Sequence, residues 1–239
     1  MNEFRTTLWT EVLLAREHGT ALDRVFGRYR APVCGFLQGQ GLQAADAEDV
    51  AQEVFQRIVE RDLLQGADKA KGRFRSLLLA IARNVLSEHR RRRGAQKRGG
   101  GRAPAPILPD DAVAPQEEEG FDRIWVANLL GQAVEAASEE DRVRGTRYVE
   151  VLLESALQGV PQAEIAHRRG IEVQDVKNWA HRARKRVSAQ LVRLVKEYAA
   201  STEEYGEELR LIARYVGEGP LAPATSGPAV RLGGDGGDA

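Results

Sequence analysis

The stretch from residue 163 to residue 184 constrains this chain most, because it has the pattern of two helices joined by a tight turn. Ile165 and Ala166 fall on the inner face of a short first helix, where a small side chain lets a second helix approach closely. Gly170 suits the turn, because a sharp chain reversal needs a residue that tolerates a positive φ. The second helix then needs a buried face. That face consists of Ile171, Val176 and Trp179.

The opposite face of this second helix is polar and basic, as expected of a helix that a helix-turn-helix unit presents to the major groove of DNA. Arg169, directly before the turn glycine, stands where such units usually carry an apolar residue. Arg169 is compatible with this position if the aliphatic part of its side chain lies along the protein surface and its guanidinium lies in water. An ordinary helical hairpin with a solvated basic face is the alternative. The side chains suited to base edges and phosphates on this face are Gln174, Lys177, Asn178, His181, Arg182, Lys185 and Arg186.

Charge is segregated along the 239 residues, although the formal net charge is zero. Residues 83–102 hold eight Arg or Lys against the single acid Glu88, whereas residues 110–122 hold six acids and no base. Such segregation indicates separate electrostatic roles along the chain. The single cysteine, Cys34, excludes an internal disulfide and fits a reducing cytoplasm, where we expect it to be packed. We expect no membrane span, because no apolar run approaches about 20 residues. We expect no signal peptide, because no basic stretch precedes the short Val-Leu-Leu-Ala run near the N-terminus.

Apolar residues recur every three or four positions through most of the chain, which predicts helices. Helices are expected over residues 5–17, 20–40, 46–61 and about 74–93, and Pro32 could kink or divide the second of these. The stretch after residue 93 is rich in Gly, Pro and charge and predicts a flexible linker. The predicted all-α fold comprises an N-terminal helical bundle (1–93), a linker (94–120), a helix-turn-helix domain (121–195), an extra amphipathic helix (196–216) and a disordered tail (217–239).

Two helices of the predicted N-terminal domain carry strongly charged faces. The helix over 46–61 gathers acidic and amide side chains without a histidine, which makes a poor metal site. From composition alone, this face is either solvated or docks on a basic protein surface. The helix ending in Arg90–Arg93 has the composition of a phosphate-binding patch, whose affinity would depend on salt.

Three segments, in this order, resemble bacterial RNA polymerase sigma factors of the extracytoplasmic-function type in the sigma-70 family. Asp46–Phe55 (Asp-Ala-Glu-Asp-Val-Ala-Gln-Glu-Val-Phe) resembles their helix that binds the core polymerase. Gly72–Asn84 is similar to their promoter-melting segment, and residues 163–184 resemble their −35-binding region. Short segments at Thr6, Lys71, Gln96 and Phe121 also resemble a subgroup with an extra C-terminal helix. The resemblance covers about residues 4–216.

The resemblance implies a function without catalysis: the chain would bind core RNA polymerase, recognise the −10 and −35 elements of promoter DNA and assist promoter melting. The residues that would read the −35 element and contact its phosphates are Gln174, Lys177, Asn178, His181, Arg182, Arg184 and Lys185. The polymerase-docking residues would be Asp46, Glu48, Asp49, Gln52 and Glu53. The residues meeting the −10 element, together with the loop over 62–71, would be Arg73, Arg83, Asn84, Ser87, Arg90 and Arg91.

Two departures from the family pattern leave the promoter sequence open. Leu77 and Leu79 occupy positions where many relatives carry Trp and Tyr, and aromatic rings help to capture unstacked bases. A stand-alone helix-turn-helix regulator that acts without polymerase is the main alternative. A regulator such as an anti-sigma factor, bound through Glu203–Val216, is a further hypothesis. We expect no enzyme activity, cofactor, metal or small-molecule substrate, because no metal or nucleophile pattern is formed by His18, His89, His167 and His181.

Overall fold

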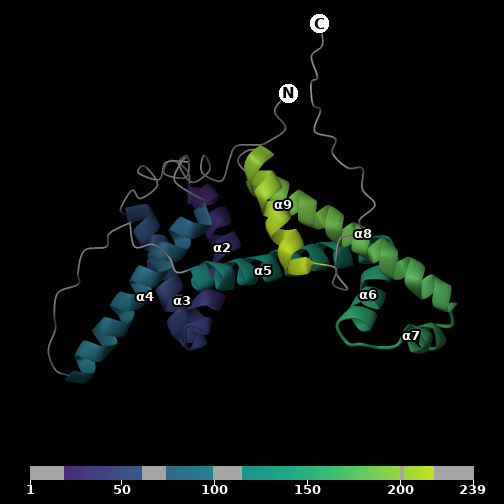
Figure 1. Ribbon diagram of the computed structural model, residues 1–239, viewed down its shortest axis with the longest axis horizontal. Coiled ribbons are helices and arrows are strands. Elements are labelled where there is room, and N and C mark those ends of the chain that lie inside the picture. The colour runs from purple at the N-terminus through teal and green to yellow at the C-terminus, as the bar shows by residue number, and fades with distance from the viewer. Residues whose placement is uncertain (1–18, 61–73, 99–114, 200–201, 218–239) are drawn as a thin grey trace, which may run out of the picture. The chain divides into compact units, whose positions relative to one another are not determined.

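The computed structural model describes residues 19–60, 74–98, 115–199 and 202–217, and this part of the chain is helical without a strand. The all-α prediction is therefore confirmed. Figure 1 shows the helices in chain order. They are α2 (Gly19–Gly39), α3 (Ala44–Glu60), α4 (Phe74–Arg98), α5 (Pro115–Val143), α6 (Tyr148–Ala156), α7 (Gln162–Arg169), α8 (Val173–Tyr198) and α9 (Thr202–Val216).

The helices divide into two compact units, and the first unit is built from two separate stretches of chain. It contains the residues up to Gly131 together with Arg193–Tyr215, whereas Gln132–Val192 belong to the second unit. The first half of α5, the end of α8 and the whole of α9 therefore belong with the N-terminal bundle. The sequence-based boundaries, which gave 121–195 to one C-terminal domain, were different.

The centre of the first unit is the apolar interface of α2, α3 and α4. Val33 and Leu37 of α2, Val54 of α3, and Leu78 and Val85 of α4 have no exposed surface. Val33 and Leu37 are four residues apart and Leu78 and Val85 are seven apart, which places each pair on one face of its helix, as the periodicity predicted. Pro32 lies inside α2 without dividing it. The helix ends at Gly39, and Gly41, two residues later, has a positive φ of 92°, which lets the Leu42 amide donate to the Leu37 carbonyl at 3.2 Å.

Helix α5 joins the first unit through aromatic side chains. The Trp125 ring stacks on Tyr29 of α2 with centroids 4.7 Å apart, and Phe121 meets Phe36 edge to face at 6.0 Å. Gly35 allows this close approach, since a Cβ there would lie 3.1 Å from Cγ2 of Ile124. Trp125 and Phe121 are at most 1% exposed. Full burial of two aromatic rings explains why the start of α5 belongs with the N-terminal helices.

Two helix boundaries differ from the predicted linker over 94–120. Helix α4 continues to Arg98, because Arg, Gln and Lys after Gly94 favour helix enough to offset one interior glycine. Helix α5 starts at Pro115, where a proline loses no hydrogen bond because the first helical amide has no partner. Glu117 and Glu118 in its first turn also interact favourably with the helix dipole.

Candidate nucleic-acid interface

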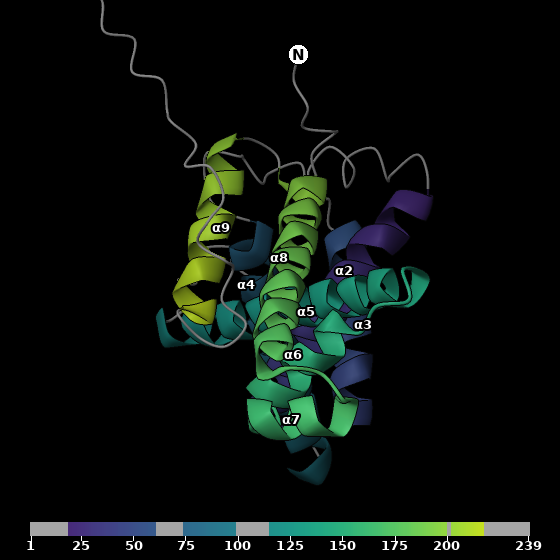
Figure 2. The ribbon, with the colours of Figure 1, turned by 90° about the vertical axis from the view of Figure 1, so that its right-hand side faces the viewer.

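The turn of the helix-turn-helix in the second unit has the predicted geometry. Gly170 is left-handed with φ 63°, and the amide of Ile171 donates to the Ala166 carbonyl at 3.1 Å, which closes the end of α7. Figure 2 shows α7 beside the N-terminal end of α8. Ile165, Ala166 and Val176 form one buried cluster with Val151 of α6. Partly buried around it are Val160, Ile171 and Trp179.

Arg169 makes a contact that sequence analysis did not expect. Its guanidinium lies 2.5 Å from a carboxylate oxygen of Glu154 and 3.0 Å from one of Glu150, both on α6. The Arg169 side chain is only 15% exposed, so its charge does not simply rest in water. An ion pair with α6 therefore fills the place where an apolar contact was expected.

The polar face of α8 is open to solvent. Lys177, Asn178 and His181 are exposed, as are Gln174 and Lys185. Arg184 is half-buried. Arg182 is exposed but held in place, since it donates to the Tyr148 hydroxyl at 2.8 Å and its guanidinium carbon lies 5.4 Å from the centre of that ring. The structure therefore brings all seven expected −35 residues onto one helix, with one of them oriented by α6.

Arg186 lies near these residues but has a different role. It pairs with the carboxylate of Asp141, which is 4% exposed. The other Asp141 oxygen accepts a 2.7 Å hydrogen bond from the Val149 amide in the first turn of α6, and the Thr146 hydroxyl donates to Asp141 at 2.9 Å. No local sequence pattern indicates this capping contact, because Asp141 precedes α6 by more residues than a local cap does.

The basic face of α4 in the first unit lines a surface hollow. Five of the residues assigned to the −10 element border it: Arg83, Asn84, Ser87, Arg90 and Arg91. Arg90 is fixed by a hydrogen bond to the Gln40 carbonyl, and Arg91 donates to the Ser87 hydroxyl at 3.4 Å. Arg73 and the loop over 62–71 lie outside the described residues. The rest of the lining is Phe36, Gln40, Leu86 and Glu117.

Glu117 is a functional candidate that sequence analysis did not identify. Its Oε2 lies 2.8 Å from Nε of Arg83, and the two side chains are 28% and 31% exposed. An acidic group from the start of α5 thus occupies part of a basic surface. The acidic run over 110–122 was a signal for this contact, but nothing in the sequence indicated where the run would dock.

Leu79 is 1% exposed, so its side chain belongs to the core and not to the surface that α4 presents. Leu77 is half-buried. The departure from an aromatic residue at position 79 therefore concerns packing, and only position 77 lies near the surface.

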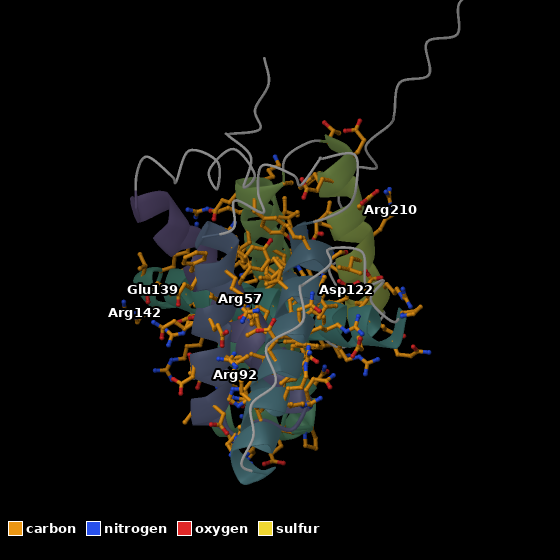
Figure 3. All side chains as sticks on the ribbon, turned by 90° about the vertical axis from the view of Figure 1, so that its left-hand side faces the viewer. Arg57, Arg92, Asp122, Glu139, Arg142 and Arg210 are labelled. Atoms are coloured by element: carbon orange, nitrogen blue, oxygen red, sulfur yellow. The ribbon has the colours of Figure 1, made fainter. Side chains whose placement is uncertain are left out.

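The acidic face of α3 is partly neutralised by arginines of its own unit. Asp46 pairs with Arg93 at 2.6 Å, and Glu53 accepts from Arg92 at 2.8 Å. Glu48 pairs with Arg30 of α2 at 2.7 Å, whereas Asp49 and Gln52 are exposed. Figure 3 labels Arg92 on the side where α3 and α4 lie. Arg92 and Arg93 of α4 thus contact the acidic face of α3 in addition to extending the basic run of α4.

Arg57 of α3 links this face to the interior. Its guanidinium lies 2.5 Å from Glu53 and 2.6 Å from Glu88 of α4, and its side chain is 13% exposed. Figure 3 labels Arg57 on the same side of the unit as Arg92. Glu53 therefore contributes to the contact between α3 and α4 as well as to the acidic surface.

Other kinds of site find no support within the part of the chain that the structure describes. No group of three His, Cys, Asp or Glu side chains there could hold a metal ion. None of its helices is long and apolar enough to cross a membrane. Burial raises the pKa of the Cys34 thiol to about 11, which is the behaviour of a packed and unreactive cysteine.

Comparison with known proteins matches both units. Residues 25–96 are similar to the family described as Sigma-70 region 2, and residues 146–187 to the family described as Sigma-70, region 4. The chain is 26% identical over 161 residues to the ferric citrate uptake sigma factor FecI of Escherichia coli (strain K12), across 67% of this chain and 85% of that relative. No solved structure gives a significant match. The matched stretches contain the α2–α4 core and the helix-turn-helix.

Proposed function

The chain belongs to the sigma-70 family as a promoter-recognising sigma factor of the extracytoplasmic-function type, and from this membership we propose which helices bind promoter DNA and which binds core RNA polymerase. In this proposal α8 reads the −35 element, α4 holds the −10 strand and α3 docks on core RNA polymerase. The observation that carries it is the presence of two separate basic helical faces, one in each unit, on a chain whose net charge is zero.

The −35 assignment rests on exposure and chemistry. Asn178 and Arg182 lie one turn apart along α8, Lys177 directly precedes Asn178, and all three are exposed. Asn and Arg side chains form the bidentate hydrogen bonds that distinguish base pairs in the major groove. Because Tyr148 orients Arg182, less of that side chain's freedom is lost on binding.

The −10 assignment rests on the hollow along α4. Arg83, Arg90 and Arg91 supply positive charge, and Asn84 supplies both a donor and an acceptor within the same hollow. Phosphates attract the arginines whatever the sequence, whereas an amide can recognise the edge of an unstacked base. A single strand separated from its duplex therefore fits this surface better than a paired one does.

The docking assignment rests on Asp49 and Gln52, which are exposed between ion-paired neighbours on α3. A basic surface of the polymerase would meet these side chains first. It would then compete with Arg92 and Arg93 for Glu53 and Asp46. Like other sigma factors, the chain would act by binding and positioning polymerase on promoters in the cytoplasm, without chemistry of its own.

A protein regulator such as an anti-sigma factor would need a surface other than the apolar side of α9. Leu211 and Ile212 are 8% and 4% exposed, so this side is already buried within the first unit. A partner bound through Glu203–Val216 would therefore contact the exposed side of α9, which includes Glu203 and Arg210.

Selection of promoters by the reconstituted complex tests the residue assignments. The full chain and core polymerase would transcribe a library in which both promoter elements are randomised, and the transcribed templates would be sequenced. Lys177→Ala should relax the base preference in the upstream element alone, since each good base contact contributes about 1–3 kcal/mol of discrimination. Arg91→Ala should weaken transcription through the downstream element.

The matched control for Lys177 is Lys196→Ala, which removes another exposed lysine near the C-terminal end of α8. It should leave both preferences unchanged. If the Lys177 and Lys196 variants select the same upstream bases as the unsubstituted chain, the −35 assignment is wrong. Tight duplex binding by the chain without any association with polymerase would instead favour a stand-alone regulator.

A further inference from the structure

The start of α5 occupies the surface proposed to hold the −10 strand. Glu117 lies 2.8 Å from Arg83 and borders the same hollow as Asn84 and Arg91. A carboxylate carries the charge sign of a phosphate and pairs with an arginine in the same way. Glu117 and a DNA phosphate therefore cannot both pair closely with Nε of Arg83.

The C-terminal end of α9 contacts the first turns of α5. The Tyr215 hydroxyl donates to the Glu119 carbonyl at 3.2 Å, and Arg214 lies 3.9 Å from the Glu119 carboxylate. Both contacts fall within two residues of Glu117. Figure 1 shows α9 beside α5. A helix near the C-terminus thus contacts the start of α5 two residues from Glu117.

Helix α9 is itself anchored by a buried carboxylate. Glu208 is 2% exposed and pairs with Arg75 of α4. Its Oε2 accepts from the Tyr198 hydroxyl at 2.7 Å and from the Trp125 indole of α5 at 3.3 Å. Arg75 also lies 3.3 Å from Asp122, which Figure 3 labels. This cluster joins α4, α5, α8 and α9 within one unit.

We propose that α9 keeps the acidic start of α5 on the basic face of α4, so that Glu117 competes with the promoter strand for Arg83 in the free chain. The inference rests on the proposed −10 role of α4 and adds regulation of that site. Glu117 leaves the hollow when a DNA strand enters it. A strand must then displace a charged group, and screening by salt weakens the competition.

The test measures binding of the full chain to a short fluorescein-labelled single-stranded DNA of mixed sequence, at low salt and without polymerase. Glu117→Gln should tighten binding about two- to fivefold, the range expected when a partly exposed ion pair no longer competes. Glu118→Gln is the matched control, because it removes the same charge from an exposed neighbour in the same turn. It should change affinity less than twofold.

A second arm tests the part assigned to α9. Glu208→Gln should increase amide hydrogen exchange over residues 115–122 and tighten DNA binding in the same direction as Glu117→Gln, while circular dichroism shows that the helices persist. Tyr215→Phe, which removes only the hydroxyl contact with Glu119, should have a smaller effect in the same direction. If neither variant changes exchange or affinity, α9 does not control the start of α5.

Arg91→Ala separates failure of this inference from failure of the proposed function. If this variant weakens DNA binding while Glu117→Gln binds as the unsubstituted chain does, α4 binds DNA and the competition by Glu117 is refuted. If neither substitution alters binding, both the competition and the −10 assignment are refuted. Tighter binding by Glu117→Gln together with weaker binding by Arg91→Ala supports both.

Discussion

Arg75 of α4 and Glu208 of α9 form an ion pair although 133 residues separate them in the chain. Their side chains are only 5% and 3% exposed. Burial opposes the charged guanidinium, but the carboxylates of Glu208 and Asp122 more than offset this, so the pKa of Arg75 is raised. The Arg75 guanidinium therefore stays charged inside the first unit, and its pair with Glu208 joins the N-terminal helices of this unit to a C-terminal one.

Removing the carboxylate of this pair should destabilise the first unit. We expect Glu208→Ala to lower the free energy of unfolding by about 3 kcal/mol, because it leaves the buried Arg75 without its closest counter-charge. Urea unfolding followed by far-UV circular dichroism measures this. Arg210→Ala, an exposed change on the same helix, should stay within about 0.5 kcal/mol. Equal losses in the two variants would mean that the pair contributes nothing to stability.

Stability should fall in alkaline solution. Burial raises the pKa values of Tyr29 and Tyr198 well above the usual value, and raises that of Cys34 to about 11. The folded chain thus keeps these protons at a pH where the unfolded chain has lost them. The free energy of unfolding therefore falls as pH rises above the unfolded pKa values of about 8.5 for Cys and about 10 for Tyr, by about 1.4 kcal/mol per pH unit for each group.

Urea unfolding at a series of pH values from about pH 8 to about pH 11 measures this slope. Tyr29→Phe removes one of the three groups, so its slope above about pH 10 should be shallower than that of the unsubstituted chain. A stability that does not change across this range would show that the three groups lose their protons equally easily in the folded and unfolded states.

The ion pair of Arg169 should stabilise the helix-turn-helix. A double-mutant cycle between Arg169→Ala and Glu154→Ala should give a coupling of about 1 kcal/mol, because both side chains are only 15% exposed. Arg168 also contacts Glu154, but it is 49% exposed. The cycle with Arg168→Ala is therefore the control and should give a coupling near zero. Similar couplings in both cycles would show that burial of Arg169 does not strengthen its pair.

Charge reversal should separate docking from folding on α3. Asp49→Lys should reduce association with core polymerase, measured as binding to polymerase immobilised on a sensor surface. It should leave the free energy of unfolding unchanged, because Asp49 is exposed. Glu53→Lys should reduce association and also lower stability by about 1–2 kcal/mol, since it places a like charge beside the half-buried Arg57.

The control for these reversals is Glu135→Lys, an exposed change on α5 in the second unit. It should alter neither polymerase association nor stability. Association of the Asp49→Lys chain at the level of this control would show that the docking face lies elsewhere.

Local patterns in the sequence predicted the helix-turn-helix well. Gly170 adopts the positive φ that its place in the pattern required, and Ile165 and Val176 are fully buried as their spacing indicated. Both properties depend on residues a few positions apart, so a short stretch of sequence contains the information. The basic face of α4 was predicted for the same reason.

Local patterns do not determine which helices pack together, because such grouping depends on contacts between distant residues. A Pro- and Gly-rich stretch before Phe121 suggested that the following helix belonged to the C-terminal domain. Phe121 and Trp125 instead pack against Phe36 and Tyr29. No local pattern shows which of two apolar surfaces an aromatic ring will cover.

By itself, the sequence determined the helical class, the turn at Gly170 and the charge of each helix face, because periodicity and backbone conformation are local properties. Only the tertiary structure decided which charges meet. It paired Glu208 with Arg75, Glu154 with Arg169 and Glu117 with Arg83. An ion pair depends on a distance of a few ångströms between side chains. For residues far apart in the chain, that distance exists only once the helices have packed.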